Sequence, residues 1–256
     1  MEMTYKNYIK GSAALVLLIL FAFRLPERKI RVYLIGDSTI SIKQTTAYPE
    51  TGWGMPFVNF FDAGVQIENR AQNGRSTKTF VAENRWQPVV DSLQKGDYVF
   101  IQFGHNDEVP TKASYTPIGD YRNYLIKFIS ETKSKGGNPV LITPVSRRKF
   151  DANGTALDTH QEYAAMVRNI AGEQHVPLID LDQKSIALLQ KLGVENSKML
   201  FNQLQPGEHP NYPEGKIDDT HFNELGAREM AQLVLKEIHV LNLDLVNHIV
   251  KPVVKK

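Results

Sequence analysis

The sequence predicts an α/β fold in which a parallel sheet is covered by helices on both faces. Two observations lead to this prediction: five short segments rich in apolar, β-branched and aromatic residues, and stretches of helical periodicity between them. Strands that alternate with helices along a chain usually pair in parallel, and the helices cover the sheet. A chain of 256 residues, 42% of them apolar, is long enough for one such domain with a sizeable core.

Five segments are predicted as strands because each is short and either apolar or alternating. They are residues 30–35, 65–69, 97–103, 139–143 and 176–181. The third segment is almost continuously apolar, which is typical of a central strand buried on both faces. The sequence therefore predicts a sheet of five parallel strands.

Helices are predicted between these strands and after the last of them. They cover residues 57–61, 79–95 with an interruption near Pro88, 121–135, 158–174, 186–192 and a final helix capped by Asn223. Residues 202–216 contain three prolines and two glycines, and they are predicted to form a long loop. No role is predicted for the tail after Leu241.

The first 27 residues are predicted to be a signal peptide or an uncleaved signal anchor, and residues 28–256 the folded domain. Lys6 and Lys10 precede an apolar stretch at 13–23, which suits a signal-peptide core and is short for a membrane span. The alternative is a buried first helix. We expect an exported protein that is periplasmic, secreted or tethered to a membrane by this segment.

Charge and cysteine content exclude several classes of function. The formal net charge is +2 and the chain has no cysteine. Disulfides, thiolate metal sites and cysteine catalysis are therefore excluded, and no basic field favours a nucleic-acid partner. The oligomeric state is not predictable from these features.

Three predicted turns, each after one of the first three strands, carry residues suited to acyl transfer. They contain Ser38 in Gly36-Asp37-Ser38, Gly74 in an Asn-Gly turn, and Asn106 in Gly104-His105-Asn106-Asp107. Loops that follow parallel strands lie at one edge of the sheet, where ligands bind in open α/β folds. A fourth turn, at 218–221, precedes the last helix.

Acyl transfer requires a nucleophile, a base, a group that orients the base, and donors for the oxyanion. Ser38 is the candidate nucleophile, His221 the base and Asp218 the orienting carboxylate. The backbone N–H groups of Ser38 and Gly74, with the side-chain amide of Asn106, are the candidate oxyanion donors. Glycine at position 74 permits positive φ and a close approach of the backbone to a ligand.

Simpler interpretations exist for several of these residues. Gly74 is also explained as a turn glycine, Asn106 as a cap of the next segment, and Asp219 is a rival to Asp218. Four side chains are candidate metal ligands: His105, Asp107, His209 and His221. Their spacing matches no known metal-binding signature, so no metal is expected. Trp53 and Trp86 are predicted to be core residues rather than sugar platforms.

The four blocks together resemble the SGNH (GDSL) hydrolases, in the order and at the spacing of that family. They are Gly36-Asp37-Ser38, Gly74, Gly104-His105-Asn106-Asp107 and Asp218-x-x-His221. The resemblance spans roughly residues 30–240 and implies a three-layer α/β/α sandwich with a five-stranded parallel sheet, of flavodoxin-like type. It also implies a Ser38–His221–Asp218 triad, oxyanion donors at Ser38, Gly74 and Asn106, and no cofactor.

Within the family, three phrases look most like the rhamnogalacturonan acetylesterase branch: 35–39, 103–107 and 218–222. The resemblance implies a serine esterase that removes O-acetyl groups from a pectic polysaccharide. Arg147 and Arg148, in a loop beyond the fourth strand, are candidate contacts for uronate carboxylates. The alternatives are an esterase for acetylated xylan or a small ester, and a catalytically silent glycan-binding protein.

Overall fold

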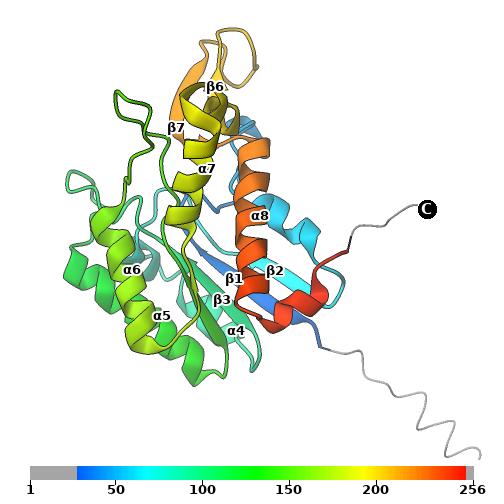
Figure 1. Cartoon of the computed structure of the whole chain (residues 1–256). Coiled ribbons are helices and arrows are strands. Elements are labelled where there is room, and N and C mark those ends of the chain that lie inside the picture. The colour runs from blue at the N-terminus through cyan, green and yellow to red at the C-terminus, as the bar shows by residue number, and fades with distance from the viewer. Residues whose placement is uncertain (1–27, 252–256) are drawn as a thin grey trace, which may run out of the picture.

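A computed structural model describes residues 28–251 and contains the predicted five-stranded parallel sheet. Its strands are β1 (Ile30–Gly36), β2 (Val65–Asn69), β3 (Tyr98–Gln102), β4 (Asn138–Ile142) and β5 (Leu178–Ile179), in the order β2-β1-β3-β4-β5 (Figure 1). The chain adds β2 on one side of β1 and then returns to add β3 on the other. The carboxyl ends of β1 and β3 therefore flank the point at which ligands bind in such sheets.

Two hydrophobic clusters lie on opposite faces of the sheet because successive side chains of a strand point in opposite directions. On one face, Val32 and Leu34 pack with α2 (Gly54–Phe57), α7 (Leu181–Asn196) and α8 (Glu224–Val240). The other face, which includes Tyr33 and Ile35, is covered by four helices. They are α3 (Thr77–Ala82), α4 (Gln87–Ser92), α5 (Ile118–Ser134) and α6 (Gln161–Gln174). The three-layer architecture is confirmed.

Most predicted helices are present, with changes at their ends. The segment predicted at 79–95 is divided into α3 and α4, and Pro88 occupies the first turn of α4, where its missing N–H costs nothing. Asn223 caps α8 by accepting a hydrogen bond from the backbone N–H of Gly226 at 3.0 Å, as predicted. The helix predicted at 186–192 is longer, since α7 spans Leu181–Asn196. Both tryptophans are core residues, with Trp53 0% and Trp86 2% exposed.

The prediction of a loop over 202–216 is wrong at both ends. β6 (Phe201–Leu204) and β7 (Lys216–Phe222) form a two-stranded antiparallel sheet, so 218–221 belongs to a strand and not to a turn. The two strands are largely polar and lack the alternation of apolar and polar residues that would predict a strand. Pairing between β6 and β7 stabilises them. The pair stands beyond the end of the main sheet, next to α7 (Figure 1).

Four short 3₁₀ segments complete the described chain: η1 (Thr45–Ala47), η2 (Val58–Phe60), η3 (Ser197–Leu200) and η4 (Asp244–His248). The last gives part of the unassigned tail a structural role, because a bridge joins Phe61 to Ile249 beyond it. The predicted leader, 1–27, lies outside the described residues. Among residues 28–251, no helix combines the length and apolar character needed to cross a bilayer.

Candidate active site

The turn after β1 fixes the backbone around Ser38. The buried carboxylate of Asp37 accepts hydrogen bonds from the backbone N–H of Thr39 at 2.9 Å and from its hydroxyl at 2.8 Å. Gln102, at the end of β3, donates to the Thr39 hydroxyl at 2.7 Å and accepts from the Trp53 indole at 2.9 Å. These bonds connect the Ser38 turn to the centre of the sheet, while Ser38 itself remains 9% exposed.

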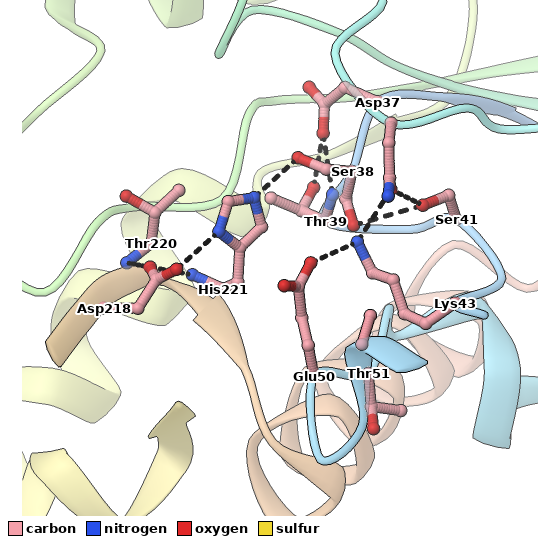
Figure 2. A network of polar contacts seen from close by, with 12 residues as sticks. Asp37, Ser38, Thr39, Ser41, Lys43, Glu50, Thr51, Asp218, Thr220 and His221 are labelled. Carbon is pink, nitrogen blue, oxygen red and sulfur yellow. Dashed lines mark hydrogen bonds and ion pairs between the residues drawn. The ribbon is translucent and has the colours of Figure 1, made fainter. Parts of the chain in front are cut away.

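Ser38, His221 and Asp218 form a continuous chain of hydrogen bonds (Figure 2). Nε2 of His221 lies 2.9 Å from Oγ of Ser38, and Nδ1 of His221 lies 2.9 Å from Oδ2 of Asp218. The other oxygen of Asp218 accepts from the backbone N–H groups of Thr220 at 2.8 Å and His221 at 2.9 Å. The imidazole is therefore held at one nitrogen and directed at the serine with the other.

The same contacts keep the Asp218 carboxyl ionised. Burial raises its pKa, but the hydrogen bonds from the His221 imidazole and from the backbone N–H groups of His221 and Thr220 outweigh that effect and hold the pKa well below its ordinary value. Asp219, the rival carboxylate, instead accepts from Arg148 Nη1 at 2.9 Å and Gln203 Nε2 at 2.7 Å. Asp218 is thus the aspartate that contacts the imidazole.

Gly74 and Asn106 lie at the wall of the pocket that contains Ser38. Gly74 has φ +74°, and a Cβ added there would meet nothing within 4 Å, so its backbone conformation is what favours glycine. Asn106 donates from Nδ2 to the carbonyl oxygen of Arg75 at 3.2 Å. An amide nitrogen carries two hydrogens, so one remains for a ligand in the pocket.

The two arginines predicted as substrate contacts occupy different positions. Arg147 lines the Ser38 pocket and forms an ion pair with Glu108, whose other oxygen lies 2.8 Å from Nδ1 of His160. Arg148 does not line this pocket. Its guanidinium contacts Asp219 at 2.9 Å and bonds to Ser197 and the carbonyl of Val194, which attaches β7 to the end of α7.

The structure adds several pocket residues that the sequence analysis did not assign. They are Glu50, Asn73, His105, Lys112 and Thr220. Thr220 and His105 are neighbours of predicted site residues, so their presence follows from the motifs. Glu50 and Lys112 lie in irregular segments with no strand-end signal, and only the folded chain places them beside Ser38.

One group of side chains among residues 28–251 has the spacing of a metal site. Ligand atoms of Glu50, Asp218 and His221 lie within 4.8 Å of one another. Lysine ammonium groups already contact both carboxylates: Lys43 lies 2.7 Å from Glu50, and Lys216 lies 3.6 Å from Glu50 and 3.4 Å from Asp218. These lysines supply the positive charge that a cation would bring.

The model of the GDSL-like Lipase/Acylhydrolase family matches residues 34–229. The chain is 43% identical to rhamnogalacturonan acetylesterase RhgT of Bacillus subtilis over 224 residues, which are 88% of this chain and 96% of that protein. It is 38% identical to the probable rhamnogalacturonan acetylesterase YesY of the same organism, over 86% of this chain and 97% of that protein.

The fold is also similar to that of a solved structure. The crystal structure of the Bacillus subtilis protein YxiM superposes with a TM-score of 0.73 at 24% identity. The match covers 86% of this chain and 58% of that one. At this level of identity the likeness concerns the fold.

Proposed function

Because this chain belongs to the GDSL-like lipase/acylhydrolase family and is a carboxylic ester hydrolase, we propose that it removes O-acetyl groups from pectic rhamnogalacturonan. The observation that carries the proposal is the hydrogen-bonded chain from Ser38 through His221 to Asp218. The alternative of a catalytically silent glycan-binding protein is not favoured, because each position that acyl transfer requires is occupied by a competent group.

In the proposed first step, the Ser38 oxygen attacks the acetyl carbonyl while Nε2 of His221 accepts the serine proton. The Asp218 carboxylate stabilises the imidazolium that forms and keeps Nδ1 protonated. The tetrahedral intermediate collapses when His221 returns that proton to the sugar oxygen. The deacetylated sugar leaves, and the acetyl group stays on Ser38.

In the second step, His221 takes a proton from a water molecule, and the water oxygen attacks the acetyl-serine. Acetate departs and the Ser38 hydroxyl is regenerated with the proton held by His221. In both steps negative charge develops on the carbonyl oxygen. The backbone N–H groups of Ser38 and Gly74 and the remaining amide hydrogen of Asn106 are the proposed donors to it.

The choice of a pectic substrate rests on two kinds of support. The two relatives described above are named as a rhamnogalacturonan acetylesterase and a probable one, and they match the chain over nearly their whole length. In addition, Lys112 brings positive charge to the pocket around Ser38, and Arg147 lines the same pocket while paired with Glu108. Cations beside the nucleophile favour a polymer that carries uronate carboxylates over a neutral one.

The proposed substrate is a polymer found outside cells, and this agrees with the export expected from residues 1–27. We therefore place the proposed activity in the periplasm, at the membrane surface or in the medium.

Acetate release from acetylated rhamnogalacturonan, xylan and peptidoglycan tests this function. The proposal predicts the highest kcat/KM on rhamnogalacturonan, with no release by the S38A variant. Brisk turnover of acetylated xylan without release from any pectic substrate would reassign the substrate. No release from any ester, with retained binding to glycans, would favour the silent binding protein.

A further inference from the structure

Lys43 is a fully buried lysine close to the proposed catalytic groups. Its side chain is 0% exposed, and its ammonium group contacts two other side chains. Its ammonium group lies 2.7 Å from Oε1 of Glu50 (Figure 2). It also donates to Oδ1 of Asn73 at 2.8 Å. Neither a family motif nor the proposed mechanism gives this lysine a role.

The first contact of Lys43 reaches the segment that carries Gly74. Asn73 immediately precedes Gly74, and its side-chain oxygen accepts from both Lys43 Nζ and the Ser41 hydroxyl. Ser41 follows Ser38 in the same turn, and its backbone N–H donates to the carbonyl oxygen of Asp37 at 3.2 Å. Lys43 and Ser41 therefore attach the Gly74 loop to the turn that holds the proposed nucleophile.

The second contact of Lys43 reaches the strand that carries the proposed base. Glu50 lines the pocket with His221, and its carboxylate lies within 4.8 Å of ligand atoms of both His221 and Asp218. The next residue, Thr51, donates its backbone N–H to the carbonyl oxygen of Phe222 in β7 at 2.8 Å. The Glu50 segment is thereby fastened to β7 beside His221.

We propose that Lys43 is a positioning residue: its buried ammonium group sets the Gly74 loop and the His221 strand relative to Ser38, through Asn73 and Glu50. The inference rests on the proposed function, because it requires Ser38 and His221 to be the catalytic groups. It assigns no contact between Lys43 and substrate. It explains why a lysine is buried at a point where three separate parts of the chain meet.

Burying this charge has a cost that packing alone would not justify. Burial lowers the pKa of Lys43, and the contact with Glu50 opposes that change. A buried ion pair is often no more stabilising than apolar residues of the same volume. A positioning role gives the pair a function, since a displacement of about 1 Å at a catalytic group can cost about 10²-fold in rate.

The test compares K43M, N73A and the double variant K43M/N73A on a chromogenic acetate ester. Each single variant should lower kcat by roughly 10-fold to 10²-fold, with KM within about twofold of the parent. K43M and N73A both break the same connection, the hydrogen bond from Lys43 to Asn73. The double variant should therefore lose no more kcat than the worse single variant. An unchanged kcat in K43M, or losses that multiply in the double variant, would overturn the inference.

Two further variants separate positioning from folding. K43M/E50Q removes both charges of the pair, so it covers the case in which K43M alone does not fold. This variant should keep the kcat defect, and full recovery of kcat would contradict the inference.

R168M is the matched control. Arg168 lies 2.8 Å from Asp180 and 2.6 Å from the buried Asp182, and none of the three lines the Ser38 pocket. R168M should lower Tm and leave kcat unchanged.

Failure of this inference is distinguishable from failure of the proposed function. The test of Lys43 measures hydrolysis of a chromogenic ester, so it remains valid even if the natural substrate is not rhamnogalacturonan. A parent chain that hydrolyses the chromogenic ester with its active serine elsewhere than Ser38 would overturn both. Labelling at Ser38 with no kcat defect in K43M and N73A would overturn the inference alone.

Discussion

Nε2 of His221 lies 2.9 Å from Oγ of Ser38, although 183 positions separate the two residues in the chain. Ser38 follows β1, which lies between β2 and β3 in the main sheet, whereas His221 lies in β7, outside that sheet. The distance between them is therefore set by the contacts of β7 with its surroundings. The bond from Thr51 to Phe222 and the contacts of Arg148 with β7 are two of these.

Replacing Asn106 by alanine tests the proposed oxyanion hole. The substitution removes the amide hydrogen that remains after Asn106 donates to Arg75. Loss of one preorganised donor costs about 10²–10³ in kcat, and we expect N106A to fall in that range with little change in KM. Steady-state kinetics on a chromogenic acetate ester measure both constants. An unchanged kcat would show that Asn106 is structural.

The D218N variant tests the role assigned to Asp218, with D219N as its control. In D218N the amide oxygen stays with the backbone N–H groups of Thr220 and His221, so the NH₂ group faces Nδ1 of His221, and kcat should fall on the order of 10⁴-fold. D219N should retain most activity, because Asp219 contacts Arg148 and Gln203 and not the imidazole. A larger loss in D219N than in D218N would reverse the assignment.

The pH dependence of the parent chain's activity follows from the pair His221 and Asp218. Only a neutral imidazole accepts the proton of Ser38, so activity should rise with pH through one ionisation. Asp218 does not contribute a second acid step, since its pKa is held well below the ordinary carboxyl range. A profile of kcat/KM against pH checks this. Two acid ionisations would contradict it.

Arg147 and Arg148 are expected to behave differently when replaced by alanine. Arg147 lines the pocket, so R147A should raise KM for acetylated pectic oligosaccharides about tenfold, the effect of losing a charged hydrogen bond of about 1.5 kcal/mol. It should spare a small neutral acetate ester. R148A should lower Tm and affect both substrates equally, because Arg148 connects β7 to α7. Equal effects of R147A on both substrates would contradict a substrate contact.

The buried carboxyl of Asp107 predicts a pH-dependent stability. Burial raises its pKa to about 7, against the opposing effect of hydrogen bonds from the Thr77 hydroxyl and backbone N–H. The folded chain therefore binds more protons than the unfolded one between about pH 4 and 7, and this contribution to stability is lost as pH rises through that window.

The D107N variant stays neutral and keeps an acceptor for Thr77. Its Tm relative to the parent should therefore increase from pH 4 to pH 8. A Tm difference that is constant or decreases over this range would show that Asp107 is not protonated in the folded chain.

The sheet and most helices were predictable because their signals are local. The apolar run of 97–103 and the spacing in 121–135 identify β3 and α5 without any tertiary information. The strand-end turns that carry Ser38 and Asn106 followed from the same reasoning. Asp218 could be chosen over Asp219 only through family spacing, and the structure places it against His221.

The remaining elements depend on contacts that the sequence does not signal. β7 consists largely of polar residues, and pairing with β6 replaces the usual apolar alternation. Glu50 lies in an irregular segment and reaches the pocket because its backbone is bonded to β7 through Thr51. Arg147 and Arg148 are adjacent in one predicted loop, and their partners distinguish them: Arg147 pairs with Glu108 at the pocket, whereas Arg148 contacts Asp219.

Mapping the site of a fluorophosphonate adduct tests the central claim most directly. If His221 activates Ser38, the parent chain should gain one adduct, and peptide mass spectrometry should place it on Ser38. S38A should gain none, and H221A should react far more slowly than the parent, with each variant's fold checked by its Tm. An adduct on any other residue, or undiminished labelling of H221A, would contradict the account.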